Sequence, residues 1–197
     1  MEIIFATGNQ HKVIEAQKAL GDSFALIMPK ELGLTEDIPE NGQTLEANAV
    51  EKAEYLWKKF GKNCFADDTG LEVDALDGAP GVYTARYAGP DKGNEANMAK
   101  LLSELERVEK EKGKIERTAR FRTVVALIID GKTTIFNGVL EGKIARSKSG
   151  SQGFGYDPVF IPDGYTTTLA EITLDEKNAI SHRGKAMRAL AEYLKCL

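Results

Sequence analysis

A long β-hairpin is the feature of this sequence that most limits its possible folds. Residues 120–129 and 133–140 are rich in strand-forming residues, and the Asp130-Gly131 pair between them is favoured in tight hairpin turns. Other strand-like and helix-like segments mix with this hairpin without strict alternation. We therefore expect an α/β or α+β fold built on a mixed sheet.

The remaining elements follow from the spacing of apolar residues. Two stretches rich in Gly and Pro predict loops at residues 29–42 and 77–92. The apolar stripes predict helices at residues 13–20, 44–60 and 94–112 and from residue 174 onward. The strand-like runs lie at residues 2–6, 24–28, 63–66 and 71–73, with a short one at 157–161.

Length and charge indicate a single domain that binds a small ligand. The chain has 197 residues, 42% of them hydrophobic and 28% charged, which is typical of an ordinary globular protein. Lys and Arg total 26 against 30 for Asp and Glu, a net charge of -4, which does not favour binding to nucleic acid. Any phosphate chemistry must therefore come from a local cluster of basic groups.

The cysteines and the N-terminus favour a cytoplasmic protein. Only two cysteines occur, so the sequence contains neither a disulfide framework nor a zinc-binding pattern. The apolar run at the N-terminus is too short for a signal peptide, and no run approaches the length of a membrane span. We expect no membrane partner.

The first candidate site is the segment Thr7-Gly8-Asn9-Gln10-His11-Lys12, between the first strand and the first helix. Free backbone N–H groups and the helix dipole favour an anion at such a position, and Lys12 adds a positive charge. The segment does not match the Walker phosphate-binding loop. By pattern alone, a plain turn and a phosphate site both fit.

The second candidate site is the acidic pair Asp67-Asp68, followed by Thr69 and Gly70 and joined by Glu40 of an earlier loop. We interpret the pair as a strand end between two short strands. Adjacent carboxylates repel one another unless a cation or a proton relieves them. Beside phosphates, Mg²⁺ is the usual cation, because it takes one or two carboxylates, phosphate oxygens and water. A turn with solvated acids is the alternative.

The third candidate site is a glycine-rich loop at residues 149–158. Its glycines leave room for a ligand, Phe154 offers a stacking face, and Asp157 can accept a hydrogen bond from a base edge. The spacing does not fit the dinucleotide-binding fingerprint. Phe154 could equally be a core residue.

The fourth candidate site is the segment from Lys177 to Gly184, which opens the C-terminal helix with Ser181 as a plausible N-cap. Lys177, His182 and Arg183 near a helix N-terminus oppose its dipole. Such an arrangement costs stability unless something negative or electron-rich lies opposite, so it indicates a functional role.

Together these segments resemble the inosine triphosphate pyrophosphatase (Ham1) family, in the family's order and over nearly the whole chain. The segments that carry the resemblance are Thr7-Gly8-Asn9-x-x-Lys12, Ala66-Asp67-Asp68-Thr69-Gly70-Leu71, Gly78-Ala79-Pro80-Gly81, Ala85-Arg86-Tyr87, Gly153-Phe154-Gly155-Tyr156-Asp157-Pro158 and Ser181-His182-Arg183-Gly184.

The resemblance implies an elongated α/β fold with a long central mixed sheet, a nucleotide cleft between two lobes, and a homodimer. It also implies Mg²⁺-dependent hydrolysis of ITP, dITP and XTP to the monophosphate and pyrophosphate. Only the resemblance supplies these particular substrates.

The resemblance also assigns roles to residues. Glu40 and Asp68 hold Mg²⁺, with Asp67 as a further or indirect ligand, and Asp68 also orients or deprotonates the attacking water. The division between the two aspartates does not follow from their chemistry alone. The expected substrate-binding residues are Thr7, Gly8, Asn9, Lys12, Lys52, Thr69, Phe154, Gly155, Tyr156, Asp157, Lys177, His182 and Arg183.

Two alternatives stay open at this point. One is a pyrophosphatase of the related Maf type, which the segment Ser181-His182-Arg183 argues against. The other is a nucleotide-binding sensor without turnover, which would not need the acidic cluster of Glu40, Asp67 and Asp68.

Overall fold

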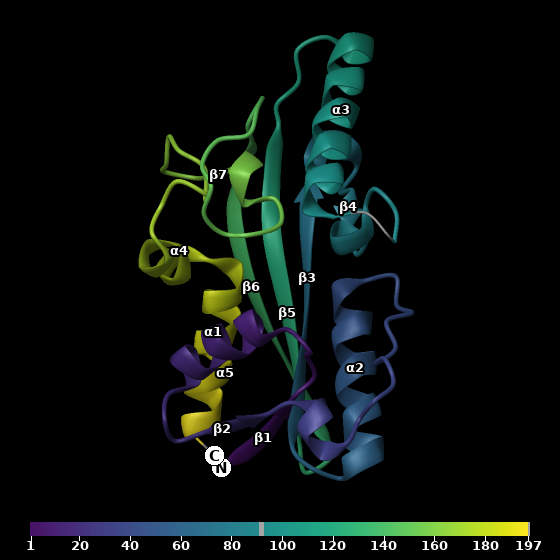
Figure 1. Cartoon of the computed structure of the whole chain (residues 1–197), viewed down its shortest axis with the longest axis vertical. Helices are drawn as coiled ribbons and strands as arrows, with labels where there is room; N and C mark the ends of the chain where they lie inside the picture. Colours follow the sequence, from purple (N-terminus) through teal and green to yellow (C-terminus); the bar gives the residue numbers. More distant parts are fainter. Residues whose placement is uncertain (91–92, 197) are drawn as a thin grey trace. The chain divides into compact units, whose positions relative to one another are not determined.

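The computed structural model describes residues 1–90 and 93–196, and it contains a mixed β-sheet (Figure 1). The strands follow the order β2-β1-β3-β5-β6-β7, and β4 pairs with β3. β1 pairs in parallel with β2 and β3, whereas β3–β4 and β6–β7 are antiparallel. The strands are β1 (Glu2–Phe5), β2 (Ala25–Ile27), β3 (Cys64–Val73), β4 (Pro80–Gly81), β5 (Thr118–Ile129), β6 (Lys132–Ile144) and β7 (Phe160–Pro162).

Helices of the described residues accompany this sheet, which confirms the expected α/β class. The α-helices are α1 (Gln10–Leu20), α2 (Leu45–Phe60), α3 (Asn94–Lys112), α4 (Leu174–Ile180) and α5 (His182–Lys195), and the short 3₁₀ segments are η1 (Pro29–Leu32), η2 (Asp74–Leu76), η3 (Thr84–Arg86) and η4 (Asp157–Val159).

The chain separates into two compact units, each assembled from distant segments. Unit 1 contains Met1–Asp68, Thr123–Gly138 and His182–Leu197, and unit 2 contains Thr69–Arg122 and Val139–Ser181. The boundaries fall within β3, β5 and β6, so each of these strands contributes residues to both units. The elongated shape, the cleft and the single domain stay predictions.

Unit 1 packs its core from β1, β3, β5 and the helices α1 and α5. Helices α1 and α5 contact one another, as Figure 1 shows. Phe5 and Phe65 from the paired strands β1 and β3 stack, with ring centroids 4.3 Å apart. Residues of α1, α5 and β1 lie in the same apolar cluster, although most of the sequence separates α1 from α5.

Unit 2 has its own apolar core, in which α3 packs against strand residues. Leu101 and Leu105 of α3 lie in one cluster with Leu71 of β3, Phe121 of β5 and Phe160 of β7. The rings of Phe121 and Phe160 lie 4.7 Å apart. This core supports the chain on both sides of the glycine-rich loop at residues 149–158.

Strand β3 corrects one sequence interpretation. Asp67 and Asp68 do not end a strand, because Cys64–Val73 is one continuous strand that includes both aspartates. Successive side chains of a strand point to opposite faces. Asp67 and Asp68 therefore point to opposite faces; Asp67 is buried, and Asp68 is partly exposed.

Two other local predictions, the hairpin turn and the helix at residues 94–112, are confirmed. Asp130 and Gly131 turn the hairpin between β5 and β6 with positive φ of 48° and 80°. α3 spans the predicted residues 94–112. The predicted loop 77–92 contains β4 and η3, and its last two residues lie outside the described residues. No helix in the described part of the chain is long and apolar enough to cross a membrane.

Helix α2 depends on a side-chain cap that can be tested. The Oγ1 atom of Thr44 accepts a hydrogen bond from the backbone N–H of Ala47 at 3.1 Å. Thr44→Ala should lower the free energy of unfolding by about 1 kcal/mol, because it removes this acceptor. Thr44→Ser keeps the acceptor and should retain most of that stability in denaturant titrations. Equal losses in both variants would show that the cap does not matter.

Candidate active site

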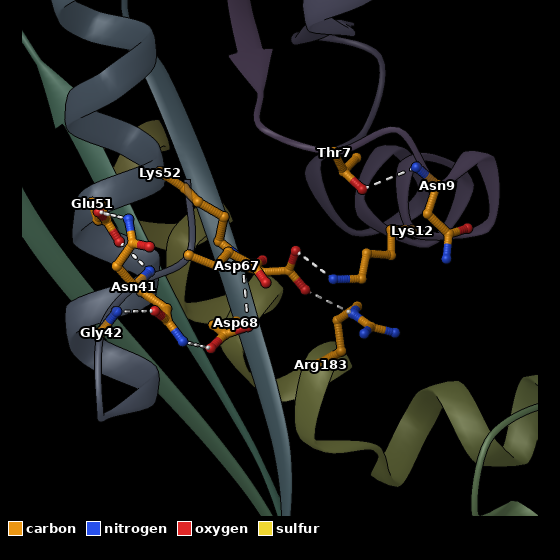
Figure 2. A network of polar contacts seen from close by, with 12 residues as sticks. Thr7, Asn9, Lys12, Asn41, Gly42, Glu51, Lys52, Asp67, Asp68 and Arg183 are labelled. Carbon is orange, nitrogen blue, oxygen red and sulfur yellow. Dashed lines mark hydrogen bonds and ion pairs between the residues drawn. The ribbon is translucent and has the colours of Figure 1, made fainter. Parts of the chain in front are cut away.

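Asp67 forms the centre of a buried ion cluster in unit 1 (Figure 2). Its side chain is fully buried, with Lys12 Nζ 2.9 Å from Oδ1 and Arg183 Nε 3.3 Å from Oδ2. Burial alone would raise the pKa of Asp67, but the positive charges of Lys12, Arg183 and Lys52 outweigh it and lower that pKa. Asp67 is therefore ionised.

Arg183, the second residue of α5, is held by two carboxylates. Besides Asp67 of β3, the side chain of Glu15 on α1 accepts a hydrogen bond from Arg183 Nη1 at 2.9 Å. Burial acts to lower the pKa of Arg183, and the two carboxylates more than offset it. The cluster thus joins α1, β3 and α5.

Asp68 lies on the opposite face of β3 and meets helix α2. Lys52 Nζ is 3.3 Å from its Oδ1 atom, and Asn48 Nδ2 donates to its Oδ2 atom at 3.1 Å. Glu40 reaches the same ammonium, with 2.5 Å between Lys52 Nζ and Oε1. Two carboxylates from different segments therefore converge on one lysine.

The charges around Asp68 are balanced differently from those around Asp67. Burial raises the pKa of Asp68, and the negative charge of Glu40 raises it further. Lys52 and Asn48 act in the opposite direction, but the net effect is an increase. Burial opposes the charge of Lys52, but Asp68, Asp67 and Glu40 outweigh it and raise the pKa of this lysine. Lys52 is therefore a cation, and Asp68 is the more basic aspartate.

Glu40 and Asp68 provide the donors that a hard cation needs. Among residues 1–90 and 93–196, no group of three or more His, Cys, Asp or Glu side chains is arranged to hold a metal ion. A cation at this point would thus have two protein carboxylates and take its other ligands from substrate and water. Mg²⁺ is commonly bound in this way, so the residues fit Mg²⁺.

The loop between β1 and α1 places polar groups at a helix N-terminus. The backbone N–H of Asn9 donates to Thr7 Oγ1 at 3.1 Å, which fixes the turn. Gly8 and Asn9 are exposed. A Cβ atom on Gly8 would meet no protein atom within 4 Å, so packing within the protein does not require glycine here.

A second cluster lies in unit 2, on the glycine-rich loop and α4. Asp157 Oδ2 accepts from the backbone N–H of Phe154 at 2.8 Å and from Lys177 Nζ at 2.5 Å. The same Nζ atom lies 4.7 Å from the centre of the Phe154 ring. A Cβ atom on Gly153 would come within 2.1 Å of Asp157 Oδ2, so this arrangement requires glycine.

The other expected site residues occupy varied positions. Tyr156 is buried in the core of unit 2, and its hydroxyl donates to the carbonyl of Thr84 at 2.9 Å. His182 is buried at the start of α5. Thr69 follows Asp68 on β3, and Gly155 has a φ of 65°, which favours glycine. Their contacts with substrate stay predictions.

The structure divides the expected base-recognition residues between two clusters. It groups Lys177 with Asp157 and Phe154, and it groups Arg183 with Asp67 and Lys12. Asp157 is buried and already accepts two hydrogen bonds at one oxygen. Its clearest role in this geometry is to hold the loop and the lysine.

Sequence reasoning missed Asn48 and Glu15. Asn48 had a detectable signal, because it is a polar residue on the buried face of α2, four residues before Lys52. Glu15 had none, since its partner Arg183 lies far along the chain. Such pairings become visible only in the folded chain.

Comparison with known proteins gives a consistent result. The model of the Ham1 family matches residues 3–193. A protein of Flavobacterium psychrophilum named dITP/XTP pyrophosphatase is 48% identical over 99% of this chain and 100% of its own length. A protein of Bacillus subtilis with the same name is 47% identical over 98% of this chain and 97% of its own length.

Solved structures show the same similarity. A HAM1 protein from Coxiella burnetii has a TM-score of 0.93 at 39% identity, with full coverage of both chains. The Staphylococcus aureus Ham1 protein has a TM-score of 0.90 at 38% identity and covers 100% of this chain and 99% of its own. With the family model matching almost from end to end, this chain belongs to the Ham1 family.

Proposed function

We propose that this chain hydrolyses dITP, XTP and ITP to the nucleoside monophosphate and pyrophosphate. The observation that carries the proposal is the convergence of Glu40 and Asp68 on Lys52, where Asp68 is the more basic of two adjacent aspartates. The names of the relatives, dITP/XTP pyrophosphatase, support the reaction and its substrates.

Glu40 and Asp68 are the residues that would hold Mg²⁺ in this proposal. When bound, the ion would neutralise charge on the phosphate oxygens and polarise the bond that breaks. Asp67 faces two cations, which favours an indirect role for it as the residue that fixes Lys12 and Arg183.

The protein residues then have distinct tasks in the reaction. Asp68 orients the attacking water and accepts its proton, for which its raised pKa is suited. Lys52 and Lys12 offset negative charge on the triphosphate. The exposed loop containing Gly8 and Asn9, at the start of α1, binds phosphate oxygens.

Base recognition is proposed for the residues around Phe154. The Phe154 side chain is 47% exposed and offers its ring to a purine, with Lys177 beside it as a donor. Lys177 supplies a donor for the carbonyl at position 6 of hypoxanthine and xanthine, where adenine has an amino group. A donor without a partner penalises adenine.

We also propose that the protein works in the cytoplasm as a homodimer. The family resemblance is the support for the dimer. A reducing compartment suits the two free cysteines, of which Cys64 is buried, and burial raises the pKa of its thiol to about 12.

Pyrophosphate release from a panel of triphosphates tests this function. ITP, dITP and XTP should be hydrolysed much faster than ATP, GTP and pyrimidine triphosphates. A preference for pyrimidine or modified nucleotides would favour a Maf-type enzyme, and binding of ITP without any turnover would favour a sensor. Either result would contradict the proposal.

The two aspartates should differ when each is replaced by asparagine. Asp68→Asn should reduce kcat by about 10²–10⁴-fold with a nearly unchanged melting temperature, because it removes the base but preserves shape. Asp67→Asn should instead cost about 3–5 kcal/mol of stability, since it leaves the buried Arg183 and the partly buried Lys12 without their shared anion. Similar behaviour of both variants would contradict this division of roles.

Metal removal should stop the reaction. EDTA should abolish pyrophosphate release and excess Mg²⁺ should restore it, because Lys12 and Lys52 alone do not neutralise the triphosphate. Ca²⁺ should support the reaction poorly, since it prefers a larger and looser shell of oxygens. Full activity in excess chelator would refute the metal assignment.

Stacking and hydrogen bonding should have separable effects on base choice. Phe154→Ala should weaken ITP and ATP alike, by about 1 kcal/mol or roughly five-fold in kcat/KM, because every purine stacks. Lys177→Met should lower kcat/KM for ITP more than for ATP, because it removes a donor for the carbonyl. Equal losses for both nucleotides in the Lys177 variant would place base choice elsewhere.

A further inference from the structure

Asn48 connects Asp68 of the proposed metal site to the loop that follows Glu40, although it carries no charge. Its side chain is buried, at 1% exposure, on the same face of α2 as Lys52. The Oδ1 atom accepts from the backbone N–H of Gly42 at 2.7 Å, and the Nδ2 atom donates to Asp68 Oδ2 at 3.1 Å. One carboxamide thus spans from the loop that follows Glu40 to the aspartate on β3.

The loop is held tightly against α2 at this point. A Cβ atom on Gly42 would lie 2.8 Å from Asn48 Oδ1 and 2.7 Å from the Cβ atom of Ala47, so the loop could not approach the helix with a larger residue. The neighbouring Asn41 donates from its backbone and its side chain to Glu51, at 2.7 and 2.8 Å. Figure 2 shows these contacts beside Asp68.

We propose that Asn48 is a positioning residue that fixes the carboxylates of Glu40 and Asp68 relative to one another. The inference rests on the proposed function, because it assigns these carboxylates to one cation. Asn48 acts through its two hydrogen bonds and does not touch substrate.

The direction of the carboxamide is determined by its partners. The backbone N–H of Gly42 requires an acceptor, so the oxygen of Asn48 faces the loop and the NH₂ group faces Asp68. If the carboxamide were flipped, its NH₂ group would face the N–H of Gly42, and its oxygen would face Oδ2 of Asp68. Because Asn48 holds Oδ2 of Asp68, the other oxygen, Oδ1, faces Lys52 Nζ, the atom that Glu40 Oε1 also contacts.

Asn97 provides a matched control in unit 2. It is also 1% exposed on a helix, α3, and both ends of its carboxamide are bonded. Its partners among the described residues are backbone groups, the N–H of Ala88 at 2.7 Å and the carbonyl of Ala85 at 3.0 Å. Replacing it disturbs a buried helix–loop connection without touching the proposed site.

The experiment compares Asn48→Asp with Asn97→Asp. Each change preserves volume, keeps the acceptor for a backbone N–H and replaces the donor with an acceptor. With dITP, Asn48→Asp should lower kcat by about 10–100-fold and raise the Mg²⁺ concentration for half-maximal activity, while KM changes much less. Asn97→Asp should lower the melting temperature yet leave kcat and the Mg²⁺ requirement as in the wild type.

A readout without turnover accompanies the kinetics. The non-hydrolysable α,β-imido analogue of dITP, added with Mg²⁺, should raise the melting temperature of Asn97→Asp as much as that of the wild type. The rise should be clearly smaller for Asn48→Asp. If Asn48 only stabilises the fold, both variants will show the wild-type increase, and the inference is wrong.

Two further variants extend the test, the first of them without a new charge at position 48. Gly42→Ala pushes the loop away from Asn48 Oδ1 and should reproduce the loss in kcat. Adding Asn48→Asp to Asp68→Asn should cause little further loss, because Asn48 acts through Asp68. Full additivity of the two losses would overturn the inference.

Failure of the two proposals is distinguishable. If the wild type releases no pyrophosphate from any triphosphate, the proposed function fails and this inference falls with it. If the wild type is active and Asn48→Asp keeps its kcat and its Mg²⁺ requirement, only the inference fails.

Discussion

The unbroken course of β3 through two adjacent aspartates is the constraint on which the site depends. Alternation along the strand sends Asp67 and Asp68 to opposite faces, so neighbouring carboxylates acquire unrelated surroundings. Asp67 meets Lys12 of α1 and Arg183 of α5, and Asp68 meets α2. A strand ending at these residues, as the sequence suggested, would impose no such separation.

Burying Asp67 is unfavourable without ion-pair partners, and the partners that offset this come from distant parts of unit 1. A carboxylate with no solvent exposure is tolerable only where cations and hydrogen bonds replace its lost hydration. Lys12 and Arg183 supply both, from the first and the last α-helix of the chain. Motifs separated by most of the sequence therefore meet at one strand, and Glu15 secures Arg183 in turn.

Strong local patterns made much of the fold predictable from the sequence. The hairpin at Asp130-Gly131 and the helix at residues 94–112 follow from turn chemistry and apolar spacing. The interruption expected at Asp67-Asp68 was wrong, because pairing with neighbouring strands outweighs the low strand propensity of aspartate and glycine. Asn48 and the grouping of Arg183 with Asp67 depend on contacts between distant segments, which no local pattern contains.

Charge balance favours one face of β3 over the other as the site of the proposed cation. Asp67 and Glu15 face Lys12 and Arg183, two anions against two cations, so that cluster is neutral. On the other face, Glu40 and Asp68 share the single ammonium of Lys52, which leaves one negative charge. Asn48 donates to Asp68 without adding charge, so it orients this carboxylate without cancelling the net negative charge that would attract a cation. A lysine at position 48 would also donate to Asp68, but its positive charge would cancel that net negative charge.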